Sequence, residues 1–69
     1  MPTRHVRPDD SDRGGWVVAT SRDSDSVESH ATTQGEAVER ARRALLDQGG
    51  GPLLVHGTDG NVREERSVG

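Results

Sequence analysis

One segment of this chain combines helical spacing with a clear start and a clear stop. Thr33 and Glu36 stand three residues apart, the spacing of a capping box that satisfies the first amides of a helix. Apolar residues then recur at helical intervals, at Ala37, Val38, Ala41, Ala44 and Leu45. Three glycines and Pro52 follow and stop the helix. The pattern predicts one helix over about residues 34–48, whose small side chains suit close packing on a sheet.

The other apolar runs are too short for helices and have the composition of strands. They cover residues 4–7, 16–20, 27–31, 53–56 and 61–64, separated by glycine, proline and acidic turn signals. The order β-β-β-α-β-β with short connections predicts an α+β fold. We expect an antiparallel sheet of four to five strands with one helix packed on one face. Residues 1–69 would form a single domain, and residues 65–69, which lack a pattern, are expected to fray.

The core of such a domain must be small. The chain has 69 residues, of which 28% are hydrophobic, and Trp16 is its only aromatic residue. With no cysteine, neither a disulfide nor a thiolate-bound metal can stabilise it. We expect Trp16 and Val18 to anchor the core against the helix, through Ala37, Ala41 and Leu45. Self-association is the leading way for a chain of this size to gain further stability.

Composition also bears on where the protein works. No run of apolar residues is long enough for a membrane span, and the N-terminal residues lack the apolar stretch of a signal peptide. We therefore expect a cytoplasmic protein with no membrane partner. Its net charge of −3 is a handicap for nucleic-acid binding, because attraction to phosphate supplies the sequence-independent part of that affinity.

The three histidines lie on three different predicted strands, at His5, His30 and His56. Zinc favours imidazole ligands, so convergence of these strands would create a metal site, with His5 and His56 as its candidate ligands. The alternative is structural, since histidines on neighbouring strands can fix the sheet's edge by hydrogen bonds. Because the sequence has no closely spaced histidine pair and no cysteine, we predict no metal and no cofactor.

An enzymatic site is equally hard to assemble from these residues. Asp59 could act as a general base beside His56, but Asp59 and Gly60 also have the sequence of a type I′ hairpin turn, which alone explains both. No serine or threonine stands in a nucleophile-elbow pattern, and residues 49–51 lack the lysine of a phosphate-binding loop. We predict that the protein is not an enzyme and has no catalytic residue.

All nine basic residues are arginines, and seven of them fall into two groups. Four lie on or near predicted strands: Arg4, Arg7, Arg22 and Arg63. A sheet bearing arginines can follow a phosphate backbone, although such sheets normally add aromatic platforms, and this chain has only Trp16. The helical arginines are expected to form a solvated face with helical acids: Arg40, Arg42 and Arg43 with Glu36, Glu39 and Asp47.

Four short motifs occur in order along the chain: His5-Val6-x-Pro8, Gly15-Trp16-x-Val18, Thr33-Gln34-x-Glu36-Ala37 and Val55-His56-Gly57-x-Asp59-Gly60. Together they resemble a family of small prokaryotic proteins catalogued as domain of unknown function 2188. The resemblance spans nearly the whole chain. It implies a compact α+β domain and brings no activity with it, so no catalytic residue is carried over.

Two classes of function follow from these observations. The second face of the sheet has no helix to cover it and must carry Val17 and Ala19, with Leu54 or with Leu53 and Val55, so it offers apolar surface to a partner. We predict a non-catalytic protein-interaction or self-associating module, a homodimer through that face or through a sheet edge. The alternative is a nucleic-acid-associated accessory domain. The candidate interaction residues are Arg4, Arg7, Val17, Ala19, His56 and Arg63.

Overall fold

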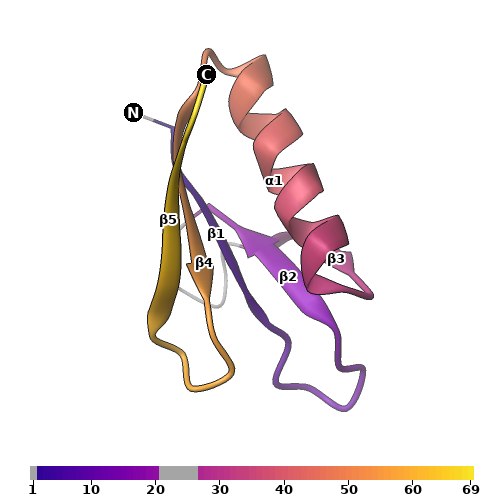
Figure 1. Cartoon of the computed structure of the whole chain (residues 1–69). Coiled ribbons are helices and arrows are strands. Elements are labelled where there is room, and N and C mark those ends of the chain that lie inside the picture. The colour runs from indigo at the N-terminus through magenta and orange to yellow at the C-terminus, as the bar shows by residue number, and fades with distance from the viewer. Residues whose placement is uncertain (1, 21–26) are drawn as a thin grey trace.

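The computed structural model describes residues 2–20 and 27–69, which form five strands and one helix (Figure 1). In chain order these are β1 (Arg4–Pro8), β2 (Trp16–Ala19), β3 (Val27–Ala31), α1 (Gln34–Asp47), β4 (Gly51–His56) and β5 (Val62–Val68). The predicted α+β class and the element order are confirmed. The polar loop expected at residues 21–26 lies outside the described residues.

The sheet has the strand order β3-β2-β1-β4-β5 and is mixed. Three of its pairings are antiparallel, as expected, but β1 and β4 at its centre run parallel. The expectation of an all-antiparallel sheet was wrong because α1 does more than cover the sheet. It carries the chain from β3 over β2 and β1 to β4, and such a crossover returns the chain in the same direction.

Helix α1 begins at the predicted position. The Thr33 hydroxyl caps it by accepting the Glu36 amide at 3.1 Å. The Glu36 carboxylate accepts hydrogen bonds from the Thr32 hydroxyl and the Arg40 guanidinium, so only half of the predicted capping box is formed. At the other end the Gly50 amide bonds the Leu45 carbonyl at 2.7 Å, with Gly50 at a φ of 97°.

Helix α1 covers one face of the sheet (Figure 1), and the core lies between the two. Its buried members are Val6, Val18, Ala31, Ala37, Ala41, Leu45 and Leu53. Trp16 packs against this cluster but is only partly buried, so it borders the core rather than anchoring it. The reason is its position, since Trp16 is the first residue of β2 and pairs with Ala31, close to where α1 begins.

The face of the sheet opposite the helix offers less apolar surface than expected. Leu54 is the β4 residue that turns to this face, beside His5, because Leu53 belongs to the core. Val17 and Ala19, which alternate with core residues along β2, are only 3% and 0% exposed. The expectation that they form an open patch was therefore wrong.

The last strand extends further than the sequence pattern indicates. Residues 65–68, expected to fray, belong to β5 and pair with residues 51–54 of β4. The pattern misses this strand because its side chains are mostly charged and exposed, while the backbone of β4 supplies its hydrogen bonds. Val68 also packs against the core. Strand β5 is thus a full edge strand, with β3 at the opposite edge of the sheet.

Candidate functional site

Two of the three histidines meet in the structure. His5 on β1 and His56 on β4 are 7% and 5% exposed, and His5 Nδ1 lies 3.0 Å from His56 Nε2. Their ring centroids are 5.2 Å apart with the planes tilted by 36°. The parallel pairing of β1 and β4 brings them together at the centre of the sheet, so the expected hydrogen-bonding role holds but not its location at an edge.

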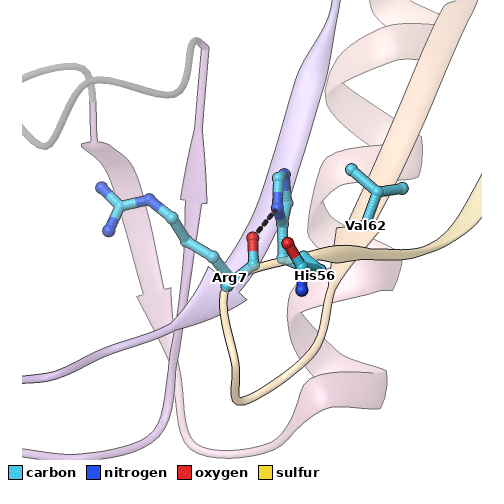
Figure 2. Close-up of a pocket in the computed structure, with 5 residues that line it drawn as sticks. Arg7, His56 and Val62 are labelled. Carbon is cyan, nitrogen blue, oxygen red and sulfur yellow. Dashed lines mark hydrogen bonds between the residues drawn. The ribbon is translucent and has the colours of Figure 1, made fainter.

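The Gly60 carbonyl group determines which ring nitrogens of this histidine pair donate hydrogen bonds. His56 Nδ1 lies 3.0 Å from the Gly60 carbonyl oxygen, the contact drawn in Figure 2. Since a carbonyl can only accept, His56 donates from Nδ1, and in its neutral form it must accept at Nε2. His5 then donates from Nδ1 to His56. The chain of two hydrogen bonds ties β1 to β4 and to the β4–β5 turn, which indicates a structural role for both rings.

The third histidine is elsewhere. His30 Nε2 donates to the Gly14 carbonyl at 2.7 Å and lies 3.4 Å from a carboxylate oxygen of Asp9. It lies on β3, pairs across the sheet with Val17 of β2, and contacts the β1–β2 connection through its side chain. In the part of the chain that the structure describes, no group of three or more His, Asp or Glu residues could hold a metal ion.

Asp59 shapes the β4–β5 turn. Its carboxylate accepts the backbone amide of Asn61 at 3.1 Å and the side-chain amide at 3.3 Å. The Asn61 backbone amide first, and the Arg63 charge among lesser causes, lower the pKa of Asp59. Gly60 alone is left-handed, with φ 86°, and its amide bonds the Gly57 carbonyl. The expected hairpin is present, but its turn is not type I′, which needs two residues at positive φ.

Arg7 stands beside the histidine pair. It lines a hollow of about 190 Å³ with His56, Gly60, Asn61 and Val62. In Figure 2 its side chain leads away from the His56 ring, across the neighbouring strand. The Arg7 Nε is buried without a hydrogen-bond partner among the described residues.

A larger hollow, of about 390 Å³, lies at the end of the sheet where α1 begins. We call it the Trp16–Arg63 groove, and it is lined by Trp16, Gln34, Val55, Gly57, Thr58, Arg63 and Glu64. Arg63 is the extra residue where the β4–β5 register shifts. Its side chain lies flat on Gly57, at which any Cβ would collide with the Arg63 stem. Because of the bulge at Arg63 and the absence of a side chain at Gly57, the Arg63 side chain lies along the groove.

The residues predicted for interaction differ in how far they are exposed to solvent. Arg4 is 5% exposed and forms two hydrogen bonds with the Glu28 carboxylate, which withdraws its charge from the surface. His56 is buried, as are Val17 and Ala19, whereas Arg63 is exposed and Arg7 is half-buried. Arg22 lies outside the described residues.

The helical arginines lie where the sequence predicts. Arg40 pairs with Glu36 at 2.9 Å, and Arg42 and Arg43 both pair with Glu39. They form a solvated face.

Gln34, Gly57 and Thr58 were not predicted from the sequence as residues of the groove. The only sequence signal for them is that Gln34 and Gly57 belong to the motifs that carry the family resemblance.

Within residues 2–20 and 27–69, no helix is both long and apolar enough to cross a membrane. Comparison with curated proteins and with solved structures finds no match. A family model described as uncharacterised proteins conserved in bacteria, DUF2188, matches residues 4–68. The match takes in all five strands and the helix, and the chain therefore belongs to this family.

Proposed function

We propose that this domain is a non-catalytic self-associating module, in which the β5 edges of two copies pair and join two sheets into one. The observation that carries the proposal is the sequence of the strand itself. The seven residues of β5 read Val-Arg-Glu-Glu-Arg-Ser-Val and occupy an edge of the sheet. An exposed edge presents unpaired backbone groups to a second strand.

Antiparallel pairing about a two-fold axis through Glu65 uses the regular part of the strand. The bulge at Arg63 turns Val62 to the face opposite the helix, beside His56, whereas Val68 packs on the helix side, so residues 64–66 carry the pairing. Each Glu64 faces Arg66 of the partner subunit, and the two Glu65 side chains meet at the axis. Two opposite-charge pairs favour this register, against one like-charge pair.

The neighbouring registers are unfavourable. A shift by one residue in one direction would set Glu64 opposite Glu65, whereas a shift in the other direction would set Glu65 opposite Arg66. Either shift would reverse the faces of one strand relative to the other. The alternation of faces along β5 thus opposes the neighbouring registers, and its charges permit the self-complementary arrangement about Glu65.

Glu64 and Arg66 are already close within one chain. They pair across the strand with Val55 and Leu53, so both lie on the helix side of the sheet, and the Arg66 Nε bonds the Glu64 carboxylate. That contact raises the pKa of Arg66. In the dimer the two Glu64 and two Arg66 side chains would form one alternating cluster.

The other edge is less suited to the same role. Strand β3 has five residues, and its pairing with β2 is irregular at Val18 and Ala19. Its Glu28 is bonded to Arg4. Strand β5 also has a bulge, at Arg63, but it has seven residues, and the residues that pair about Glu65 lie beyond that bulge.

Charge reversal tests the pairing directly. Glu64→Arg or Arg66→Glu alone places like charges opposite one another twice in the dimer. At roughly 0.2–1 kcal/mol for each cross-strand pair, we expect dissociation to become about ten-fold easier. The double variant Glu64→Arg with Arg66→Glu restores the opposite charges, and its dissociation constant from sedimentation equilibrium should return towards that of the unmodified chain.

The matched control is charge reversal on the helix, Glu39→Arg, which should leave association unchanged because Glu39 forms its ion pairs with Arg42 and Arg43 of the same helix. Thermal unfolding of each variant shows whether its fold is intact. If both single variants associate as strongly as the unmodified chain, or if the double variant is no better than either, β5 is not the interface.

A further inference from the structure

We propose that the Trp16–Arg63 groove binds a ligand in which a flat ring is joined to an anionic group, the chemistry of a nucleotide. This inference rests on a different observation from the pairing of β5, although Arg63 and Glu64 of that strand also line the groove.

One wall of the groove supplies a surface for a ring. Trp16 is only partly buried and lines the groove together with Val55. An indole face left beside a hollow can stack on a planar ring, and such stacking tolerates any ring with a π face. The volume of about 390 Å³ is within the size range of small-molecule sites.

Other residues of the lining supply hydrogen-bond donors. Arg63 is exposed and has no ion pair or side-chain hydrogen bond within the described residues, unlike Arg40, Arg42 and Arg66. Gln34 and Thr58, with an amide and a hydroxyl, also line the groove. A guanidinium and two neutral donors suit an anionic group such as phosphate.

The groove also contains one acid, which limits the anion it accepts. The Glu64 carboxylate is held by Arg66, so part of its charge is offset and its oxygens are turned to that partner. Because Arg63 lies on Gly57 rather than against Glu64, its donors are left for a ligand. With one arginine and one paired glutamate, a monoanionic or dianionic group attached to a ring fits better than a free, highly charged anion.

The fluorescence of Trp16 can be used to measure ligand binding in the groove. Trp16 is the only aromatic residue, so all intrinsic fluorescence comes from the groove. The probes are adenosine monophosphate, adenosine, inorganic phosphate and a short single-stranded oligoadenylate. We expect saturable quenching by the monophosphate, with adenosine and phosphate each binding at least about ten-fold more weakly, since one charged hydrogen bond contributes roughly 1.5–3 kcal/mol.

Arg63→Gln should weaken binding of the monophosphate by about ten-fold and leave adenosine unaffected. Arg42→Gln, which removes an exposed helical arginine bonded to Glu39, is the control and should change neither. Sedimentation of Arg63→Gln checks that association is intact, so the failure of this site is distinguishable from the failure of β5 pairing.

Either nucleotide source supports the proposal. Tighter, salt-sensitive binding of the oligonucleotide would assign the site to single-stranded nucleic acid, and equal binding would assign it to free nucleotides. Absence of saturable quenching by the monophosphate, equal binding of phosphate alone, or full binding by Arg63→Gln would overturn it.

Discussion

Gly14 and Gly15 stand side by side in the β1–β2 connection with similar backbones but different surroundings. Their φ angles are 68° and 78°, the left-handed region that favours glycine. A Cβ on Gly14 would meet nothing within 4 Å, whereas one on Gly15 would lie 2.6 Å from the Ala31 carbonyl oxygen and 2.9 Å from His30 Nε2. Only Gly15 is therefore constrained by packing as well as by conformation.

We expect Gly14→Ala to cost about 1 kcal/mol of unfolding free energy, from backbone conformation alone. Gly15→Ala should cost about 3 kcal/mol or more, because overpacking adds to the same strain. Urea unfolding of the two variants measures the difference. Equal losses would show that the close approach of β3 to Gly15 is not rigid.

Asp9 lies in the β1–β2 connection and contributes to the pH dependence of the protein's stability. Hydrogen bonds from the Ser11 hydroxyl and amide, followed by contact with Arg13, hold the pKa of Asp9 at about 2, below its ordinary 3.8. A carboxyl whose pKa is lowered on folding stabilises the native state above its unfolded pKa. That contribution is present above about pH 4 and is lost as the pH falls towards 2.

Asp9→Asn keeps an oxygen that accepts the Ser11 amide but cannot titrate. We expect its unfolding free energy to fall less steeply between about pH 4 and pH 2 than that of the unmodified chain. Denaturant unfolding across this range measures both slopes. Identical slopes would mean that Asp9 titrates alike in the folded and unfolded states.

Residue types alone predict little of how the histidines are used. The sequence places His5 and His56 on strands, but only the parallel β1–β4 pairing makes them neighbours. Asp59 and Gly60 do predict a hairpin, while the choice of turn depends on the bulge that inserts Arg63. Side-chain partners distant in sequence require the topology, which local spacing does not contain.

At the scale of the elements, the sequence itself marks where α1 begins and ends. Thr33→Ala removes the hydroxyl that caps the Glu36 amide, and we expect a loss of about 1 kcal/mol of stability. Thr32→Ala is the matched control, since it removes only an exposed bond to the Glu36 carboxylate. Thermal and urea unfolding compare the two. If the losses are equal, the Thr33 hydroxyl has no special role at the helix start.

The strands differ in how far sequence predicts them. β2 and β3 have the predicted boundaries to within one residue, because turn signals flank them on both sides. The strand predicted at residues 61–64 ends too early, because the last residues of β5 lack apolar alternation and pair through the backbone of β4. Edge strands with charged side chains are poorly marked by periodicity, since neither face is buried.

For the whole molecule, topology decides which surfaces are left for function. The two hairpin loops lie at one end of the sheet and both chain termini at the other, with β5 along a free edge (Figure 1). The sequence predicted a helix on a sheet and an association surface. It placed that surface partly on Val17 and Ala19, which prove to be buried, so the exposed β5 edge is the better basis for association.

The most direct test of β5 pairing is an isotope-filtered NOE experiment on a mixture of labelled and unlabelled chains. Such an experiment detects contacts between copies alone, and Glu65 lies on the proposed two-fold axis, beside Glu65 of the partner subunit. We predict intermolecular cross-peaks among the protons of Glu64, Glu65 and Arg66. A mass of one chain, 7.4 kDa, at the concentration of the experiment with no such cross-peaks would contradict it.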